Sequence, residues 1–216
     1  MTGSLTPSFT EQFLGAIGSL DQFGPTLQIL DVGTGTARIP VAICRRRNGI
    51  KITAVDRAAG ILRRARRRVA REGLEDAIRV DQADAGELPY AERSFDAVIS
   101  NGLVHHLPNR IAALCEMVRV LRPGGLLFVR DSLPQSDAET IASTFDRIVG
   151  KARCASAAVR IAPGALSIEE ARTLASAAGL PHEWVRHSAQ RHWLLAGRIL
   201  SPARACCSVA RTLPPP

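Results

Sequence analysis

The stretch Ile29-Leu30-Asp31-Val32-Gly33-Thr34-Gly35-Thr36-Ala37-Arg38 decides the fold. A continuous apolar run leads into a glycine-rich turn, and a helical pattern begins directly after it. Gly33 and Gly35 let the backbone turn sharply and approach a ligand without side-chain collisions. The start of the helix offers unpaired N–H groups to the same ligand. We therefore expect a strand, a turn and a helix that together bind a nucleotide-like molecule.

The residues around the two glycines indicate which molecule this is. The dinucleotide fingerprint G-x-G-x-x-G needs a glycine where this chain has Arg38, which disfavours a nicotinamide dinucleotide. Asp31 lies two residues before Gly33. A carboxylate there would repel a pyrophosphate but attract a ligand that carries an ammonium and a sulfonium group. The pattern thus favours S-adenosylmethionine, with the alternative that Asp31 stabilises only its own turn.

Acidic residues also follow the next two apolar runs. Asp56 ends the second run, where its two oxygens match the vicinal hydroxyls of a ribose. The alternative is that Asp56 caps the arginine-rich helix that follows. Asp84 comes after the third run and can accept a proton from the adenine amino group. Three acids, each after a successive strand, favour one nucleoside site.

Apolar runs and helical stretches alternate along the chain. The expected strands are 26–32, 50–56, 78–81, 95–100 and 125–131, and the expected helices are 8–20, 38–47, 58–72 and 110–121. The strand candidates are mostly continuous in Val and Ile, as in strands covered on both faces. This alternation predicts an α/β fold with a parallel sheet and right-handed crossovers.

Beyond residue 131 the pattern changes. We expect a helix at 137–149, a covering segment at 152–163, a helix with a capping box at 167–178, and a hairpin from 182–188 and 191–200. The tail 201–216 ends in three prolines and is expected to be disordered. Residues 1–200 are predicted to form one domain, with the N-terminal helix in 1–25 covering the pocket.

Together these motifs resemble the class I S-adenosylmethionine-dependent methyltransferases, most closely the small-molecule branch that includes the ubiquinone and menaquinone biosynthesis enzymes. The matching segments are Leu30-Asp-Val-Gly-Thr-Gly-Thr36, Val55-Asp56, Asp84-Ala85, Ser94-Phe-Asp-Ala-Val-Ile-Ser100 and Leu121-Arg-Pro-Gly-Gly125. The resemblance implies a Rossmann-like three-layer sandwich. Its seven-stranded, mostly parallel sheet would have the order 3-2-1-4-5-7-6, an antiparallel strand 7 and helices on both faces.

The resemblance also implies a set of cofactor-binding residues. The methionine moiety would lie beside the glycine turn, the ribose at the second acid, the adenine near the third, and the reacting methyl at the end of the fourth strand. The implied residues, in that order, are Gly33, Thr34, Gly35 and Thr36; Asp56; Arg57, Asp84 and Ala85; and Ser100 and Asn101. After Gly102-Leu103 the chain departs from the quinone enzymes, so the resemblance does not specify a quinone acceptor.

Candidate catalytic residues follow the fourth and fifth strands. The positive sulfur already activates the methyl donor, so direct SN2 transfer mainly requires alignment of the acceptor. His105 and His106 follow the fourth strand and Asp131 ends the fifth. Each could act as a base for a hydroxyl or an acidic carbon, or could be purely structural. No metal is expected.

Composition restricts the partners. The net charge is +8, and six arginines between residues 63 and 71 fall in one predicted helix, which suits either a nucleic-acid partner or a solvated helix face. The fourth strand is followed by Ser100-Asn101-Gly102-Leu103 rather than the proline-rich aromatic segment of many base methylases, and aromatic residues make up only 4%. We therefore expect a small-molecule acceptor. The alternatives are a methyltransferase of RNA or another nucleic acid, and a non-catalytic subunit that binds S-adenosylmethionine.

Hydrophobic patterning and cysteines suggest a compartment. The chain has no run of about 18 apolar residues that would span a membrane, and it has no secretory signal pattern. The five cysteines show neither C-x-x-C nor metal-ligand spacing; they are Cys44, Cys115, Cys154, Cys206 and Cys207. We expect reduced thiols and a cytoplasmic protein.

Overall fold

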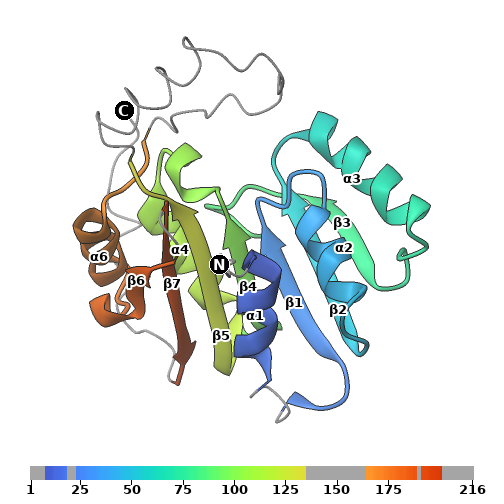
Figure 1. The fold of residues 1–216 in the computed structure, drawn as a ribbon, viewed down its shortest axis with the longest axis horizontal. Coiled ribbons are helices and arrows are strands. Elements are labelled where there is room, and N and C mark those ends of the chain that lie inside the picture. The colour runs from blue at the N-terminus through green and yellow to red at the C-terminus, as the bar shows by residue number, and fades with distance from the viewer. Residues whose placement is uncertain (1–7, 19–22, 135–163, 189–190, 201–216) are drawn as a thin grey trace, which may run out of the picture.

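A seven-stranded sheet runs through the computed structural model, which describes residues 8–18, 23–134, 164–188 and 191–200 (Figure 1). The strands in spatial order are β3 (Ile78–Gln82), β2 (Ile50–Asp56), β1 (Leu27–Val32), β4 (Phe95–Asn101), β5 (Leu121–Ser132), β7 (His192–Ile199) and β6 (Val185–His187). The first five pair in parallel, whereas β7 pairs antiparallel with both β5 and β6. The expected strand order and the antiparallel strand 7 are confirmed.

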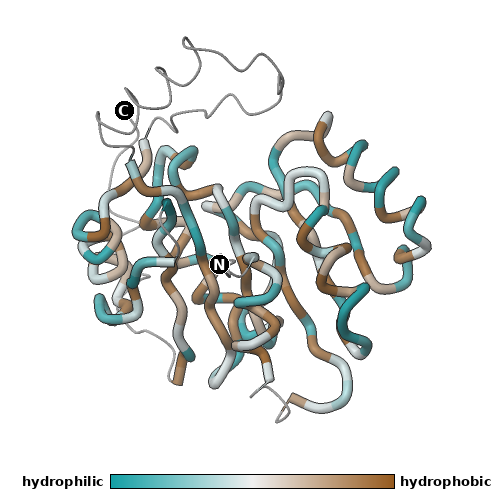
Figure 2. Tube along the Cα trace, in the orientation of Figure 1, coloured by the Kyte–Doolittle hydropathy of each residue, from teal (hydrophilic) through white to brown (hydrophobic). Residues whose placement is uncertain are grey.

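Helices cover both faces of this sheet. On one face lie α1 (Phe9–Ile17), α2 (Arg38–Cys44) and α3 (Ala59–Arg71), whose buried side chains form one apolar cluster with the strands. On the other face lie α4 (Arg110–Arg119) and α6 (Ile168–Ala177), which contribute to a second cluster. The central strands are predominantly hydrophobic in Figure 2, in accordance with their continuous apolar runs. The expected three-layer architecture is confirmed.

Helix α1 is fixed to the sheet by aromatic packing. Ser8 and Glu11 form a capping box at its start, which is a local reason for the helix to begin there. The rings of Phe9 and Phe13 meet the ring of Phe128 edge-on, at centroid distances of 5.3 and 5.6 Å. This packing holds the first turn of α1 beside the carboxyl end of β5.

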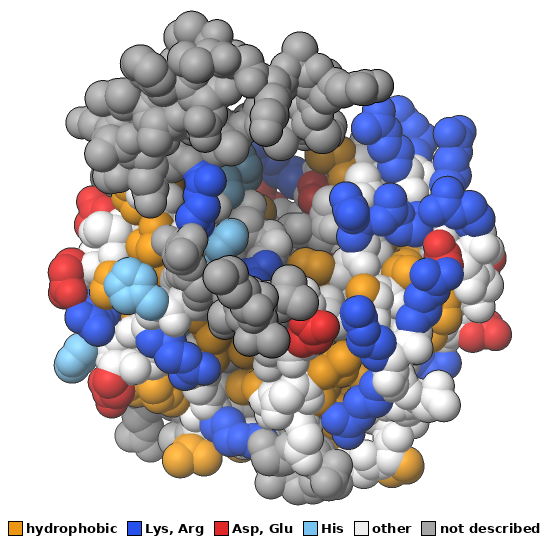
Figure 3. All heavy atoms as spheres, viewed as in Figure 1, with side chains coloured by type: hydrophobic (Ala, Val, Ile, Leu, Met, Phe, Trp, Pro, Cys, Tyr) orange, Lys and Arg blue, Asp and Glu red, His pale blue; other side chains and the backbone are white. Residues whose placement is uncertain are grey.

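The arginine-rich helix α3 has one buried stripe and one exposed face. Leu62, Ala65 and Val69 are buried, as the helical period predicts. Five arginines of this helix are exposed and Arg68 is half-buried; the five are Arg63, Arg64, Arg66, Arg67 and Arg71. Figure 3 shows Lys and Arg side chains gathered over this part of the molecule. The helix therefore forms a solvated basic face, and its geometry does not identify a partner.

The C-terminal elements differ in part from expectation. The capping box of Ser167 and Glu170 opens α6, as predicted. The expected strand 182–188 is wrong for its first half, because His182–Trp184 form the short helix η3. The indole ring of Trp184 lies directly over Gly197 of β7, where a Cβ would collide with it. The turn thus places the indole against β7, a contact that strand periodicity does not reveal.

Several other segments agree with expectation only in part or lie outside the described residues. β5 begins at Leu121 rather than 125 and pairs with β4 through a register shift. The predicted helix 137–149, covering segment 152–163 and tail 201–216 lie outside the described residues. The single-domain boundary at residue 200 stays a prediction. Each helix of the described part is too short or too polar to cross a bilayer.

The cysteines contradict one expectation. Cys44 is a free thiol, but Cys115 is disulfide-bonded. The prediction that every cysteine is reduced is therefore wrong at Cys115, and the cysteines no longer support a reducing compartment. Spacing could not show this bond, because a disulfide depends on which distant segments meet in the fold.

Candidate functional site

A cavity of about 940 Å³ opens at the carboxyl ends of the parallel strands. Its volume is in the upper part of the range of about 300–1,000 Å³ that is typical of small-molecule sites. Its wall includes the glycine turn, the ends of β2 and β4, the loop 83–86, the segment 106–109 and the first turn of α1. Open α/β sheets bind their ligands at this edge, so the cavity is the candidate functional site.

The glycine turn is a rigid part of this wall. Gly33 and Gly35 have φ angles of +77° and +58°, in the left-handed region that glycine tolerates. A Cβ at Gly33 would lie 2.9 Å from the side chain of Leu103. The N–H groups of Gly33 and Thr34 both donate to the Val55 carbonyl of β2, at 2.9 and 2.8 Å. The turn is thereby fixed to the neighbouring strand, with Thr34, Gly35 and Thr36 lining the cavity.

Asp31 brings a buried carboxylate to the cavity, and one of its two oxygens has no hydrogen-bond partner among the described residues. Its side chain is only 2% exposed, and the oxygen without a partner is Oδ2. Burial raises the pKa of Asp31 to about 7; the Thr34 hydroxyl opposes this shift, and the negative charge of Asp56 adds to it. A buried polar atom without a partner is costly, and a bound cation would satisfy it. The residue therefore fits the ammonium and sulfonium groups of S-adenosylmethionine.

Asp56 links the end of β2 to the glycine turn. Its Oδ2 accepts a hydrogen bond from the N–H of Gly35 at 3.0 Å, and its Oδ1 accepts one from the N–H of Ala58 at 2.9 Å. The N-cap position of α3 is Ala58, so Asp56 does not cap that helix. Each carboxylate oxygen keeps a second lone pair that can accept from a hydroxyl.

The third acidic loop closes the same side of the cavity. Asp84 accepts a hydrogen bond from the N–H of Gly86 at 2.8 Å, and Ala85 is buried beside it. Arg57 lies 3.8 Å from Asp84, but both side chains are exposed, so this ion pair contributes little to stability. The structure therefore brings Asp31, Asp56 and Asp84 to one cavity wall.

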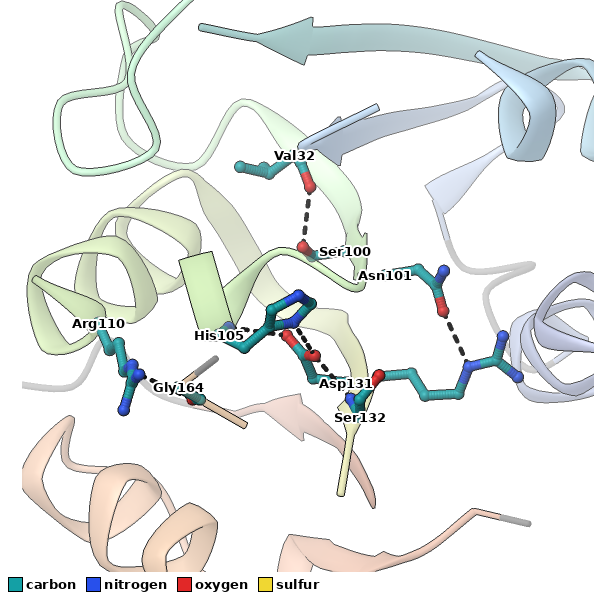
Figure 4. Close-up of polar contacts among 9 residues, drawn as sticks. Val32, Ser100, Asn101, His105, Arg110, Asp131, Ser132 and Gly164 are labelled. Carbon is teal, nitrogen blue, oxygen red and sulfur yellow. Dashed lines mark hydrogen bonds and ion pairs between the residues drawn. The ribbon is translucent and has the colours of Figure 1, made fainter. Parts of the chain in front are cut away.

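The two candidates at the end of β4 point to different places. Ser100 is buried and its hydroxyl donates to the carbonyl of Val32 at 2.8 Å, so it ties β4 to β1 and does not line the cavity (Figure 4). Asn101 does line the cavity, and its Oδ1 accepts a hydrogen bond from Nε of Arg130 at 2.9 Å. Arg130 was not predicted from the sequence as a site residue, although a charged residue within the apolar run of β5 could have indicated one.

The three catalytic candidates lie together but only one reaches the cavity. Asp131 is 1% exposed; its Oδ1 lies 2.5 Å from Nδ1 of His105, and its Oδ2 accepts from the His105 N–H at 3.1 Å (Figure 4). Asp131 thereby ties the short helix η2 (Val104–His106) to the end of β5. The rings of His105 and His106 lie 3.9 Å apart, and His106 is the one that lines the cavity.

Comparison with known proteins identifies the fold and its cofactor. Residues 30–129 match the family described as methyltransferase domain. Over this segment the chain is similar to S-adenosylmethionine-dependent methyltransferases. The family resemblance inferred from the sequence is thus confirmed over residues 30–129, and S-adenosylmethionine is the cofactor that this resemblance implies.

The methyltransferase domain is similar to enzymes of several kinds. It is 39% identical over 116 residues to methyltransferase GfsG of Streptomyces halstedii, covering 54% of this chain and 41% of the relative. It is 32% identical over 107 residues to the ubiquinone/menaquinone biosynthesis C-methyltransferase UbiE of Desulfotalea psychrophila, covering 50% and 42%. The chain thus aligns with less than half the length of these relatives. A solved S-adenosylmethionine-dependent methyltransferase of Aquifex aeolicus shares the fold, with a TM-score of 0.63, 18% identity, and coverage of 88% and 89%.

Proposed function

We propose that this protein is an S-adenosylmethionine-dependent methyltransferase that transfers the methyl group directly to a small-molecule acceptor. The observation that carries the proposal is the cavity in which the buried carboxylate of Asp31, with no described partner for Oδ2, lies beside those of Asp56 and Asp84. A cationic nucleoside would satisfy the first acid and use the other two as hydrogen-bond acceptors. The similarity to small-molecule methyltransferases supports the same class of acceptor.

We assign one part of the cofactor to each segment of the cavity wall. Asp31 would attract the ammonium and sulfonium groups, and the turn from Gly33 to Thr36 would hold the methionine moiety. Asp56 would accept hydrogen bonds from the ribose hydroxyls. The loop of Asp84 and Ala85, with Arg57 beside it, would hold the adenine. Asn101 would face the reacting methyl group, while Ser100 holds the end of β4 against β1 from behind the wall.

Methyl transfer in this cavity requires little covalent chemistry from the protein. S-adenosylmethionine, when bound, would supply a methyl carbon that its positive sulfur activates, and the acceptor would take this methyl as the carbon–sulfur bond breaks to leave a neutral thioether. Holding the two reactants in line can supply about 7–11 kcal/mol of the barrier. When the acceptor is a hydroxyl, its proton must leave, and we assign the base to His106 because this histidine lines the cavity. His105 and Asp131 then act as positioning residues that hold η2.

The described cavity wall favours a small acceptor over a nucleic-acid base. Among Phe, Tyr and Trp residues of the described chain, Phe9 alone lines the cavity. Enzymes that grip a flipped base usually stack it between aromatic or apolar side chains. The basic face of α3 is the observation that keeps nucleic acid as the second candidate.

The proposal is tested by a labelled-methyl screen. The purified protein is incubated with S-adenosylmethionine carrying a deuterated methyl group and with fractionated metabolite extracts, and products are sought by their mass gain. We expect label transfer to a small molecule, lost in Asp31→Asn, whereas an exposed control such as Arg64→Gln keeps it. Binding of S-adenosylmethionine without any transfer would favour the regulatory-subunit alternative. Transfer into RNA would favour the nucleic-acid alternative, and failure of the folded protein to bind the cofactor would refute the proposal.

A further inference from the structure

Arg130 is a half-buried cation on the cavity wall that the assignments above leave unused. It lies on β5 beside Asn101 of β4, its register partner. Its Nε donates to the Asn101 side chain at 2.9 Å, and the carbon of its guanidinium group lies 5.0 Å from the centre of the Phe9 ring. The amide and the ring hold the guanidinium in one orientation, the latter by a cation–π contact. The guanidinium group is therefore oriented in advance for binding a ligand in the cavity.

The charge of Arg130 has no counterion among the described residues. Its one hydrogen bond to a described residue uses Nε, which leaves the two Nη groups without a protein acceptor there. The neighbouring acid Asp131 points to the opposite side of the strand, where it binds His105. Burial also lowers the pKa of Arg130. A half-buried arginine without a counterion is best stabilised by an anion that accepts hydrogen bonds from both Nη groups.

We propose that Arg130 is an anion-binding residue of the cavity and that it receives a carboxylate group of a bound ligand. This inference rests on the proposed function. On the same wall lies Asp31, a buried acid whose Oδ2 has no partner among the described residues, so the cavity presents one site for a cation and one for a carboxylate. The carboxylate can come from two sources: the methionine end of the cofactor, which carries an ammonium and a carboxylate, or an acidic acceptor.

Two ligand pairs distinguish these sources. Each pair consists of a carboxylate and a matched ligand without that group. The first pair is S-adenosylhomocysteine and its decarboxylated analogue, which share the nucleoside, the sulfur and the amino group. The second pair is benzoate and benzamide, titrated into protein saturated with S-adenosylhomocysteine. Affinities are measured by calorimetry for the wild type, Arg130→Gln, Arg130→Lys and the exposed control Arg64→Gln.

We expect Arg130→Gln to weaken the carboxylate member of at least one pair about tenfold or more while its partner binds as before. Arg130→Lys keeps the charge but loses the planar fork, so its loss should be smaller. A loss for S-adenosylhomocysteine assigns the carboxylate to the cofactor, and a loss for benzoate assigns it to the acceptor. The partner ligand also reports that the variant is folded.

The inference is overturned if Arg130→Gln leaves both carboxylates bound as in the wild type, or if it weakens both members of a pair equally. Arg130 would then only support Asn101. Failure of the wild type to bind S-adenosylhomocysteine is a different result, because it refutes the proposed function before any variant is compared.

Discussion

We expect the affinity for S-adenosylmethionine to depend on pH, because the pKa of the buried Asp31 carboxyl is raised. Burial raises the pKa of this carboxyl to about 7 in the free protein. The protonated carboxyl has no charge to offer a sulfonium or an ammonium group, so the cation binds the ionised form. Bound cation lowers the pKa of Asp31, and affinity must therefore rise with pH until the free protein is fully ionised.

The size of this effect follows from the pKa. An acid with a pKa of about 7 is ionised in about 3% of molecules at pH 5.5 and in about half at pH 7. The affinity for S-adenosylmethionine should therefore increase about 15-fold over this range, which corresponds to about 1.6 kcal/mol. Above this range the gain ends, because the cofactor's own amino group begins to lose its proton at a pKa of about 7.7–8.0.

Calorimetric titration of S-adenosylmethionine at pH 5.5, 6.25 and 7 measures the effect. Asp31→Asn removes the ionisable group and should bind more weakly at pH 7, with a flat profile between pH 5.5 and 7. Asp84→Asn is the matched control, because it removes an exposed acid of the same cavity and should keep the slope of the wild type. A wild-type affinity that is constant over this range, or an equal slope in Asp31→Asn, would refute the reasoning.

Three further variants test the site and the fold. Asp56→Ala should weaken cofactor binding by about 1.5–3 kcal/mol through loss of charged hydrogen bonds, measured by calorimetry on protein with an intact circular-dichroism spectrum. Gly33→Ala should lower the free energy of unfolding by about 1–3 kcal/mol, because φ is +77° and the Cβ would meet Leu103; a urea midpoint equal to that of the wild type would contradict this. Phe13→Ala should cost about 3–5 kcal/mol, since its fully buried ring packs on Phe128, and thermal unfolding monitored with a surface control such as Arg64→Gln measures it.

Local patterns were sufficient to predict the central sheet. Ile50–Asp56 was predicted to the residue, because a buried parallel strand needs a continuous apolar run and its charged end marks where the ligand edge begins. The strand order could be predicted only from the family resemblance, since hydrophobic runs do not record which strands pair. The error at His182–Trp184 has a physical origin: the turn is set by the fit of Trp184 against Gly197, a contact between distant residues.

The residues proposed to bind the cofactor could likewise be predicted from local sequence patterns. The residues proposed to face the acceptor could not, because their positions depend on contacts between distant parts of the chain. Asp31, Asp56 and Asp84 each end or follow a strand, and parallel strands bring their ends to one edge. Adjacent residues such as His105 and His106 cannot be told apart by spacing. Which of them reaches the cavity depends on Asp131, which lies 26 residues further along the chain.

Two adjacent charged residues at the end of β5, Arg130 and Asp131, have different roles. Arg130 and Asp131 are neighbours on β5, so their side chains leave opposite faces of the strand. Asp131 is buried and its oxygens bind His105 and Ser132, which fixes the position of η2. Arg130 emerges on the cavity side, where the described residues supply no counterion for it. One strand end thus supports η2 and presents a cation to the cavity. We therefore expect Asp131 variants to change the position of His106, the proposed base, and Arg130 variants to change the binding of an anion.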